Sequence, residues 1–132
     1  MPPKTNQPSD LELQLLSVLW NQGPSTVRQV LSNLPDGKDR AYTTILTVMQ
    51  NLEKKGLVKR TTKGTAHVYH PTESQKKTLR PVMQGLLQNV FRGRVAHVMQ
   101  HLLEDSQVTD DELEEIRALI DKRQNAKRKG KK

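Results

Sequence analysis

The 132-residue chain contains no cysteine, and only 3% of its residues are aromatic. Without cysteine it can form neither disulfides nor thiolate metal sites, so it suits a reducing compartment. Its hydrophobic content of 33% is low for a self-sufficient core in a chain of this length. A partner subunit that completes the burial of apolar surface is therefore expected.

Long hydrophobic runs are also missing. No run approaches the roughly 18 apolar residues that a membrane-spanning helix needs. The first ten residues, MPPKTNQPSD, lack the apolar centre of a signal peptide. The sequence therefore predicts a cytoplasmic protein that does not insert into a membrane.

Arrangements typical of enzymes do not stand out either. The sequence offers no Ser/His/Asp set, no glycine-rich phosphate loop and no paired-carboxylate site. The acidic residues between 110 and 115 are better explained as the favourably charged start of a helix. We therefore predict that the protein is not an enzyme and needs no cofactor.

Two histidines, His97 and His101, are four residues apart on one predicted helix and could share a metal ion. No glutamate or cysteine stands beside them as a further ligand. Exposed polar positions or interface contacts are the simpler interpretation, and we predict no metal site.

Charge is distributed unevenly along the chain, whose net charge is +8. Residues 1–72 hold nine Lys and Arg against five Asp and Glu, residues 73–125 hold eight against nine, and residues 126–132 hold five against none. A basic N-terminal half suits a polyanionic partner such as nucleic acid.

Residues 39–71 are the most informative stretch. A helical apolar stripe is formed by Ala41, Ile45, Val48, Met49 and Leu52, and Gly56 follows where a left-handed residue would end the helix. Residues 57–62 and 65–70 then predict two strands around a Lys63-Gly64 turn. A polar-faced helix followed by a basic hairpin is the layout of a winged helix-turn-helix, in which the helix enters the major groove of DNA.

This layout predicts which residues contact DNA. The polar side of the helix supplies candidates for the major groove, with Tyr42 near the helix start and able to reach a phosphate: Arg40, Tyr42, Thr43, Thr44, Thr47 and Gln50. The helix end and the hairpin supply candidates for phosphate contacts: Lys54, Lys59, Arg60 and Lys63. Threonine is a poor helix former, yet it occupies three of the five positions from 43 to 47. This concentration favours a ligand-binding face over an ordinary helix surface.

Two helices are predicted before this stretch. Ser9 and Glu12 form a capping box for the first, which contains Trp20 as an expected core residue. Ser25 is the expected cap of the second. The fold class is therefore mainly α with a small β-hairpin: a disordered N-terminus at 1–8 and a winged-helix domain at 9–72.

Three amphipathic helices are predicted in residues 73–125, the first capped by Thr72 with Gln75 and containing Pro81, the last capped by Thr109 with Glu112. Their apolar residues have little else in the chain to pack against, so we predict a helical dimerisation region. Its candidate interface residues are Leu86, Val90, Val95, Val98, Met99, Leu102, Leu113, Ile116, Leu119 and Ile120. Residues 126–132 are expected to be a basic disordered tail.

Three segments resemble the penicillinase-repressor family of BlaI-, MecI- and CopY-type bacterial repressors. AYTTILTVMQNLEKKGLVKR resembles its recognition helix and wing, ELQLLSVLW its first helix, and residues 91–120 its dimerisation region. The resemblance covers residues 11–120 and implies a homodimeric transcriptional repressor that binds a palindromic operator in double-stranded DNA. The cysteine-rich metal site of CopY-type relatives has no counterpart here, because the chain has no cysteine.

The resemblance also implies a mode of release. In the family, a membrane sensor protease or an induced cleavage cuts the dimerisation region. The matching bond here is His101–Leu102, where well-known members have Asn-Phe.

Two alternatives come from other classes. A non-specific nucleic-acid or chromosome-coating protein would use the basic hairpin and tail without sequence choice. A protein-interaction adaptor would present an apolar or acidic outer helix face, and this face is neither.

Overall fold

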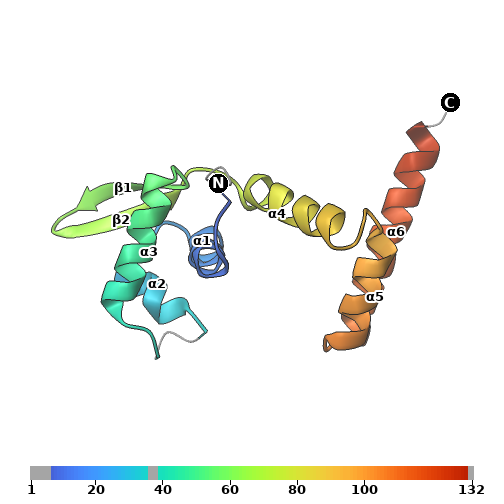
Figure 1. Cartoon of the computed structure of the whole chain (residues 1–132), viewed down its shortest axis with the longest axis horizontal. Coiled ribbons are helices and arrows are strands. Elements are labelled where there is room, and N and C mark those ends of the chain that lie inside the picture. Colours follow the sequence, from blue (N-terminus) through green and yellow to red (C-terminus); the bar gives the residue numbers. More distant parts are fainter. Residues whose placement is uncertain (1–6, 36–38, 131–132) are drawn as a thin grey trace. The chain divides into compact units, whose positions relative to one another are not determined.

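The computed structural model describes residues 7–35 and 39–130 of the chain (Figure 1). It divides into two compact units, one ending at Gly85 and the other beginning at Leu86. The expected disorder of residues 1–8 concerns mostly positions 1–6, which lie outside the described residues, as do positions 36–38.

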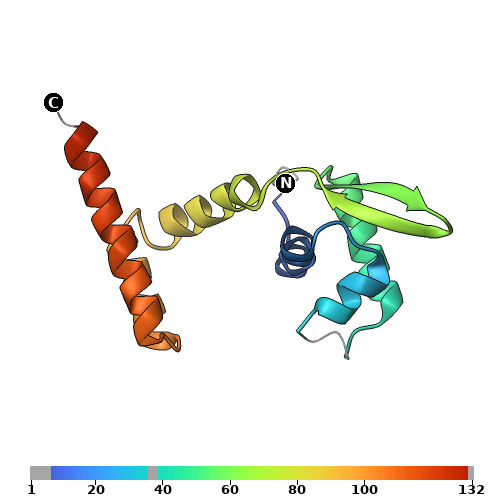
Figure 2. The same cartoon turned by 180° about the vertical axis from the view of Figure 1, so that it is seen from behind.

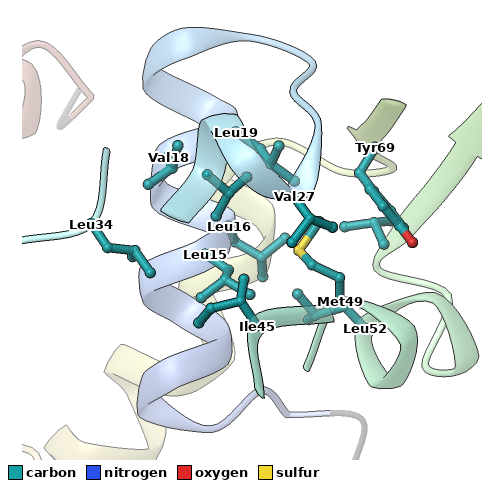
Figure 3. Close-up of a cluster of buried hydrophobic side chains, with 12 residues drawn as sticks. Leu15, Leu16, Val18, Leu19, Val27, Leu34, Ile45, Met49, Leu52 and Tyr69 are labelled. Atoms are coloured by element: carbon teal, nitrogen blue, oxygen red, sulfur yellow. The ribbon is translucent and has the colours of Figure 1, made fainter. Parts of the chain in front are cut away.

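The first unit contains three helices and a hairpin: α1 (Asp10–Gln22), α2 (Val27–Asn33), α3 (Tyr42–Lys54), β1 (Val58–Lys63) and β2 (Ala66–Pro71). Its buried core comes from all five elements: Leu15, Leu16, Val18, Leu19, Val27, Val30, Leu34, Ile45, Met49, Leu52, Val58 and Tyr69 (Figure 3). Trp20, expected inside, packs half-buried at the border of this core, and its indole N–H donates to the Glu73 carbonyl at 3.0 Å.

Helix α1 begins with the predicted capping box. The Ser9 hydroxyl accepts from the Glu12 N–H at 3.2 Å, and the Glu12 carboxylate accepts from the Ser9 N–H at 2.8 Å. The helix ends at Gly23, which has a φ of 88°. Glycine adopts this backbone conformation without the steric strain that other residues would suffer.

The predicted cap of α2 was wrong by one residue. Thr26 is the cap and forms a capping box with Gln29, because Ser25 is used elsewhere. Ser25 is buried and pairs with Tyr69: each backbone N–H donates to the other's carbonyl, at 3.1 and 2.8 Å. This isolated bridge attaches the start of α2 to the free edge of β2.

Helix α3 ends as predicted, with Gly56 at φ 78°. The Leu57 N–H donates to the Leu52 carbonyl and the Gly56 N–H to the Glu53 carbonyl, each at 3.0 Å, which is the Schellman pattern. The Thr72 hydroxyl donates to the Gly56 carbonyl at 2.7 Å. This bond joins the exit of the hairpin to the end of α3, so Thr72 is not the cap of the next helix.

The hairpin is antiparallel, and its register runs from Val58 opposite Pro71 to Lys63 opposite Ala66. The two-residue loop is therefore Gly64-Thr65, one position later than predicted. Gly64 has a φ of 64° at the first loop position, where a type II′ turn favours glycine. The loop points away from the three helices in both views (Figures 1 and 2). Three helices followed by such a hairpin make a winged helix, so the predicted fold class is confirmed.

Helix α4 (Gln75–Asn89) crosses the division between the units. Ser74 caps it, accepting from the Lys77 N–H at 3.1 Å, which corrects the expected Thr72 box. Pro81 lies inside the helix, six residues after its start, so it does not mark the beginning of the helix. The compact units divide within α4, between Gly85 and Leu86. The division between a DNA-binding domain ending at residue 72 and a dimerisation region beginning at residue 73 stays a prediction.

The second unit continues with α5 (Val95–Asp105) and α6 (Asp110–Gly130). The joint before α5 is a left-handed pair, Arg92 at φ 53° and Gly93 at φ 81°. Neither α5 nor α6 has a buried residue within the chain.

The prediction of a disordered tail was wrong for residues 126–130, which continue α6; residues 131–132 lie outside the described part. Ala126 and the lysines and arginine after it are good helix formers. Acidic residues in the first turn and Lys127, Arg128 and Lys129 in the last turn both match the helix dipole. These local preferences extend the helix beyond its last apolar residue.

Candidate nucleic-acid interface

Helix α3 has one buried and one exposed face. Ile45, Met49 and Leu52 are completely buried. Ala41, expected on the same stripe, is instead the exposed residue that precedes the helix. Four of the six predicted groove-facing residues lie along the exposed side of the helix: Thr43, Thr44, Thr47 and Gln50. The helix thus presents hydroxyl and amide groups outward, with no acidic residue in its first turn.

The orientation of one hydroxyl limits what it can read. Thr47 Oγ1 donates to the Thr43 carbonyl at 3.0 Å, the bond that threonine often makes within helices. Its proton is therefore engaged, while its lone pairs remain able to accept. In DNA such an oxygen would accept from an exocyclic amine, and the methyl group could touch a thymine methyl.

Two candidates lie at the start of the helix rather than along it. Tyr42 is its first residue and is 40% exposed. Arg40 was predicted on the recognition helix, but it precedes the helix and is half-buried. The prediction was wrong because Ala41 was counted as part of the helix. At Ala41 the backbone still has the extended conformation, with ψ 144°, so Arg40 lies before the helix.

The basic residues of the hairpin divide into two kinds. Lys59 and Lys63 are exposed on one face of β1, and Lys54 is exposed at the end of α3. Arg60 lies on the other face, opposite Tyr69, and its Nε is 3.7 Å from the Glu53 carboxylate. Burial raises the pKa of Tyr69 and the nearby Arg60 charge opposes that shift. The ion pair between Arg60 and Glu53 therefore connects the hairpin to α3.

Lys55 supports the site and was missed in the sequence. Its Nζ lies 2.6 Å from Glu12 Oε1, a carboxylate whose side chain is only 6% exposed. Burial raises the pKa of Glu12, but the hydrogen bonds from Lys55 and Ser9 and the Lys55 charge outweigh it, so the pKa is lowered from 4.5. The pair joins the end of α3 to the start of α1. No local sequence signal relates residues 43 positions apart.

The two histidines of the second unit lie in a cluster of rings. Phe91, His97 and His101 form a ring cluster with centroids 5.0 to 5.5 Å apart. Across residues 7–35 and 39–130, no group of three or more His, Cys, Asp or Glu could hold a metal ion. Within the same ranges no helix is long and apolar enough to cross a membrane.

The fold and the polar, exposed face of α3 define a winged-helix protein of the DNA-binding type. The chain belongs to the penicillinase repressor family, whose model matches residues 8–122. The predicted family is thereby confirmed. It is a family of repressors rather than of enzymes, in agreement with the prediction that the protein is not an enzyme.

Curated relatives cover almost the whole chain. It is 34% identical to the transcriptional regulator BlaI of Mycobacterium tuberculosis, over 89% of this chain and 85% of that one. It is 24% identical to the penicillinase repressor of Bacillus licheniformis, over 95% and 98%. With the methicillin resistance regulatory protein MecI of Staphylococcus aureus it shares 21% identity over 91% and 98%.

Proposed function

We propose that the protein is a homodimeric transcriptional repressor that acts in the cytoplasm and binds a two-fold symmetric operator in double-stranded DNA. The observation that carries this proposal is the outward face of α3, where Thr43, Thr47 and Gln50 are exposed on a helix anchored by a buried core. Membership of a repressor family supports it. Each subunit would insert its α3 into the major groove of one half-site.

Selection of bound sites from random DNA tests the proposal. A symmetric motif with half-sites one or two helical turns apart is the expected result. The selected site should bind at least about a thousandfold more tightly than unrelated DNA. Binding without any enriched motif would contradict a repressor and indicate the non-specific coating protein instead.

Thr47 should read one base pair. We expect Thr47→Ala to change the preference at one position of each half-site by about 1–3 kcal/mol. Thr47→Val keeps the methyl group and removes the acceptor, whereas Thr47→Ser keeps the acceptor and removes the methyl group. Measuring affinities of all three variants for operators substituted at each position shows which group reads the base. Equal losses on every sequence would contradict base reading by Thr47.

Lys63, beside the hairpin loop, should contact a phosphate without sequence choice. We expect Lys63→Gln to weaken binding to the operator and to unrelated DNA by similar factors, and to reduce the slope of log K against log salt by about one for each half-site. The measurement is a salt titration of affinity on both duplexes. Lys122→Gln, an exposed lysine of α6, is the charge-matched control. A sequence-dependent loss for Lys63→Gln would contradict the assignment.

The second unit would form the dimer. Seven of the ten predicted interface residues are exposed by 38% to 65% in the single chain: Leu86, Val90, Val95, Leu102, Leu113, Leu119 and Ile120. Val98, Met99 and Ile116 are half-buried. Three helices with no buried apolar residue need a partner to cover these stripes, and a second copy also supplies the second α3.

Cleavage of the dimerisation region is the proposed route of release, with a membrane sensor protease as the partner. The His101–Leu102 bond lies in the interior of α5. A protease would therefore need this part of α5 to unwind first. Incubation with a cognate sensor should yield fragments that end at residue 101; an intact chain with unchanged operator binding would contradict this route.

A further inference from the structure

A groove of about 200 Å³ lies between the start of α2, the start of α3 and the hairpin. Its lining includes Arg28, Tyr42, Thr65 and His67, with Val27 and Leu46 among the apolar contributors. None of its lining residues is acidic. The groove thus gathers a guanidinium, a phenol, a hydroxyl and an imidazole at the corner between the recognition helix and the wing.

Arg28 is held in this groove by an aromatic ring. Its guanidinium carbon lies 5.2 Å from the centroid of the Tyr42 ring, within the range of a cation–π interaction. In the part of the chain that the structure describes, no carboxylate forms an ion pair with Arg28. Stacking on a ring leaves the N–H groups at the edge of the guanidinium available for an anion.

We infer that this groove binds one phosphate of the DNA backbone, with Arg28 as the charged donor and the Tyr42 ring as the platform that positions it. The inference rests on the proposed function, in which α3 lies in the major groove. A helix in that groove has a sugar-phosphate backbone along each side. The groove of the protein is lined by the start of α3 and by the hairpin, and one of those backbones would pass there. Arginine suits this task because its guanidinium can donate hydrogen bonds to two phosphate oxygens at once.

The first test compares charge-matched variants. Arg28→Gln should weaken binding to the operator and to unrelated DNA about tenfold for each half-site, the effect of one lost charged hydrogen bond, and lower the salt slope by about one for each half-site. Arg123→Gln removes an equal charge from exposed α6 and should change neither quantity appreciably. Equal effects of the two variants would overturn the inference, because only net charge would then matter.

The second test locates the phosphate. Operators are prepared with one neutral methylphosphonate at each successive backbone position. At one position in each half-site, the neutral methylphosphonate should lower the affinity of the wild-type protein. The same substitution should leave the affinity of Arg28→Gln unchanged. If every methylphosphonate costs both proteins the same, Arg28 does not contact a phosphate.

The third test addresses the platform. Tyr42→Phe keeps the ring and should retain the contribution of Arg28, whereas Tyr42→Leu should lose it. In the Arg28→Gln background, Tyr42→Leu should then cause little further loss. Additive losses would overturn the positioning role of Tyr42. Circular dichroism spectra matching that of the wild-type protein show that the variants are folded.

These outcomes separate this inference from the proposed function. If the wild-type protein selects no symmetric site, the repressor proposal fails. If it selects one, but Arg28→Gln binds it as tightly as Arg123→Gln does, only the phosphate groove is wrong. Competition with free inorganic phosphate should leave operator affinity unchanged beyond its ionic strength, whereas specific inhibition would assign the groove to a free anion.

Discussion

Replacing Ile120 by glutamate should convert the proposed dimer into monomers. Ile120 is 53% exposed in the single chain and belongs to the apolar stripe of α6. Burying an isoleucine side chain contributes about 1.5–3 kcal/mol, and two-fold symmetry places the residue twice in the interface. The loss of about 3–6 kcal/mol corresponds to a dimer dissociation constant raised about a hundredfold to ten-thousandfold. Analytical ultracentrifugation over a range of protein concentrations measures this constant.

Ala118→Glu is the matched control for Ile120→Glu. Residue 118 is exposed on the same helix, two positions away and therefore about 200° around the helix axis. It should leave the dimer intact. Operator binding by Ile120→Glu should fall steeply, because each α3 must then bind its half-site alone. A dimer that survives Ile120→Glu unchanged would remove α6 from the interface.

Lys55→Gln should destabilise the winged-helix unit by about 3 kcal/mol, because it leaves the Glu12 carboxylate buried without its cation. Domains of this size are stable by only about 5–15 kcal/mol, so the loss is large. Urea unfolding at a fixed protein concentration measures it. Lys59→Gln, an exposed lysine of β1, should cost well under 1 kcal/mol. The double variant Glu12→Gln with Lys55→Met should recover much of the loss; a full sum of the single losses would contradict a coupled pair.

The same pair predicts a pH dependence. The pKa of Glu12 is lowered in the folded chain from its usual 4.5, so the unfolded chain binds the proton more tightly. The stabilisation is therefore fully present above about pH 4.5, and it is lost as the pH falls through the lowered pKa. Unfolding free energies of the wild type and Glu12→Gln should converge over that acid range. A constant difference at all pH values would show that Glu12 is not ionised in the folded state.

Local patterns were reliable where a residue acts on its sequence neighbours. The Ser9–Glu12 capping box, the stop at Gly56 and the buried stripe of Ile45, Met49 and Leu52 are all present as predicted. Each follows from helical geometry over three or four residues, which tertiary contacts rarely overrule. The exposed Thr43 and Thr47 follow from the same periodicity.

Errors arose where a residue had a second partner far along the chain. Ser25 and Thr72 both have good capping chemistry, yet Ser25 pairs with Tyr69 and Thr72 binds the Gly56 carbonyl. The distant bond occupies the hydroxyl of Thr72 itself. In Ser25 the backbone makes the distant bonds, and the hydroxyl donates to the Gly23 carbonyl at 2.8 Å. The stacking of Arg28 on Tyr42 was missed for the same reason, since a single arginine 14 positions before a tyrosine carries no signal.

The amino-acid sequence by itself determined the order of helices and strands, the polar outer face of α3 and the family, because these depend on spacing and on residue types in register. Only the tertiary structure decided which basic side chains pair with other groups of the protein and which are exposed to solvent. It placed Lys55 on Glu12 and Arg60 near Glu53, left Lys59 and Lys63 exposed, and stacked Arg28 on Tyr42. The physical reason is that a charge acts over a few ångströms in space, and distance along the chain does not determine distance in the fold.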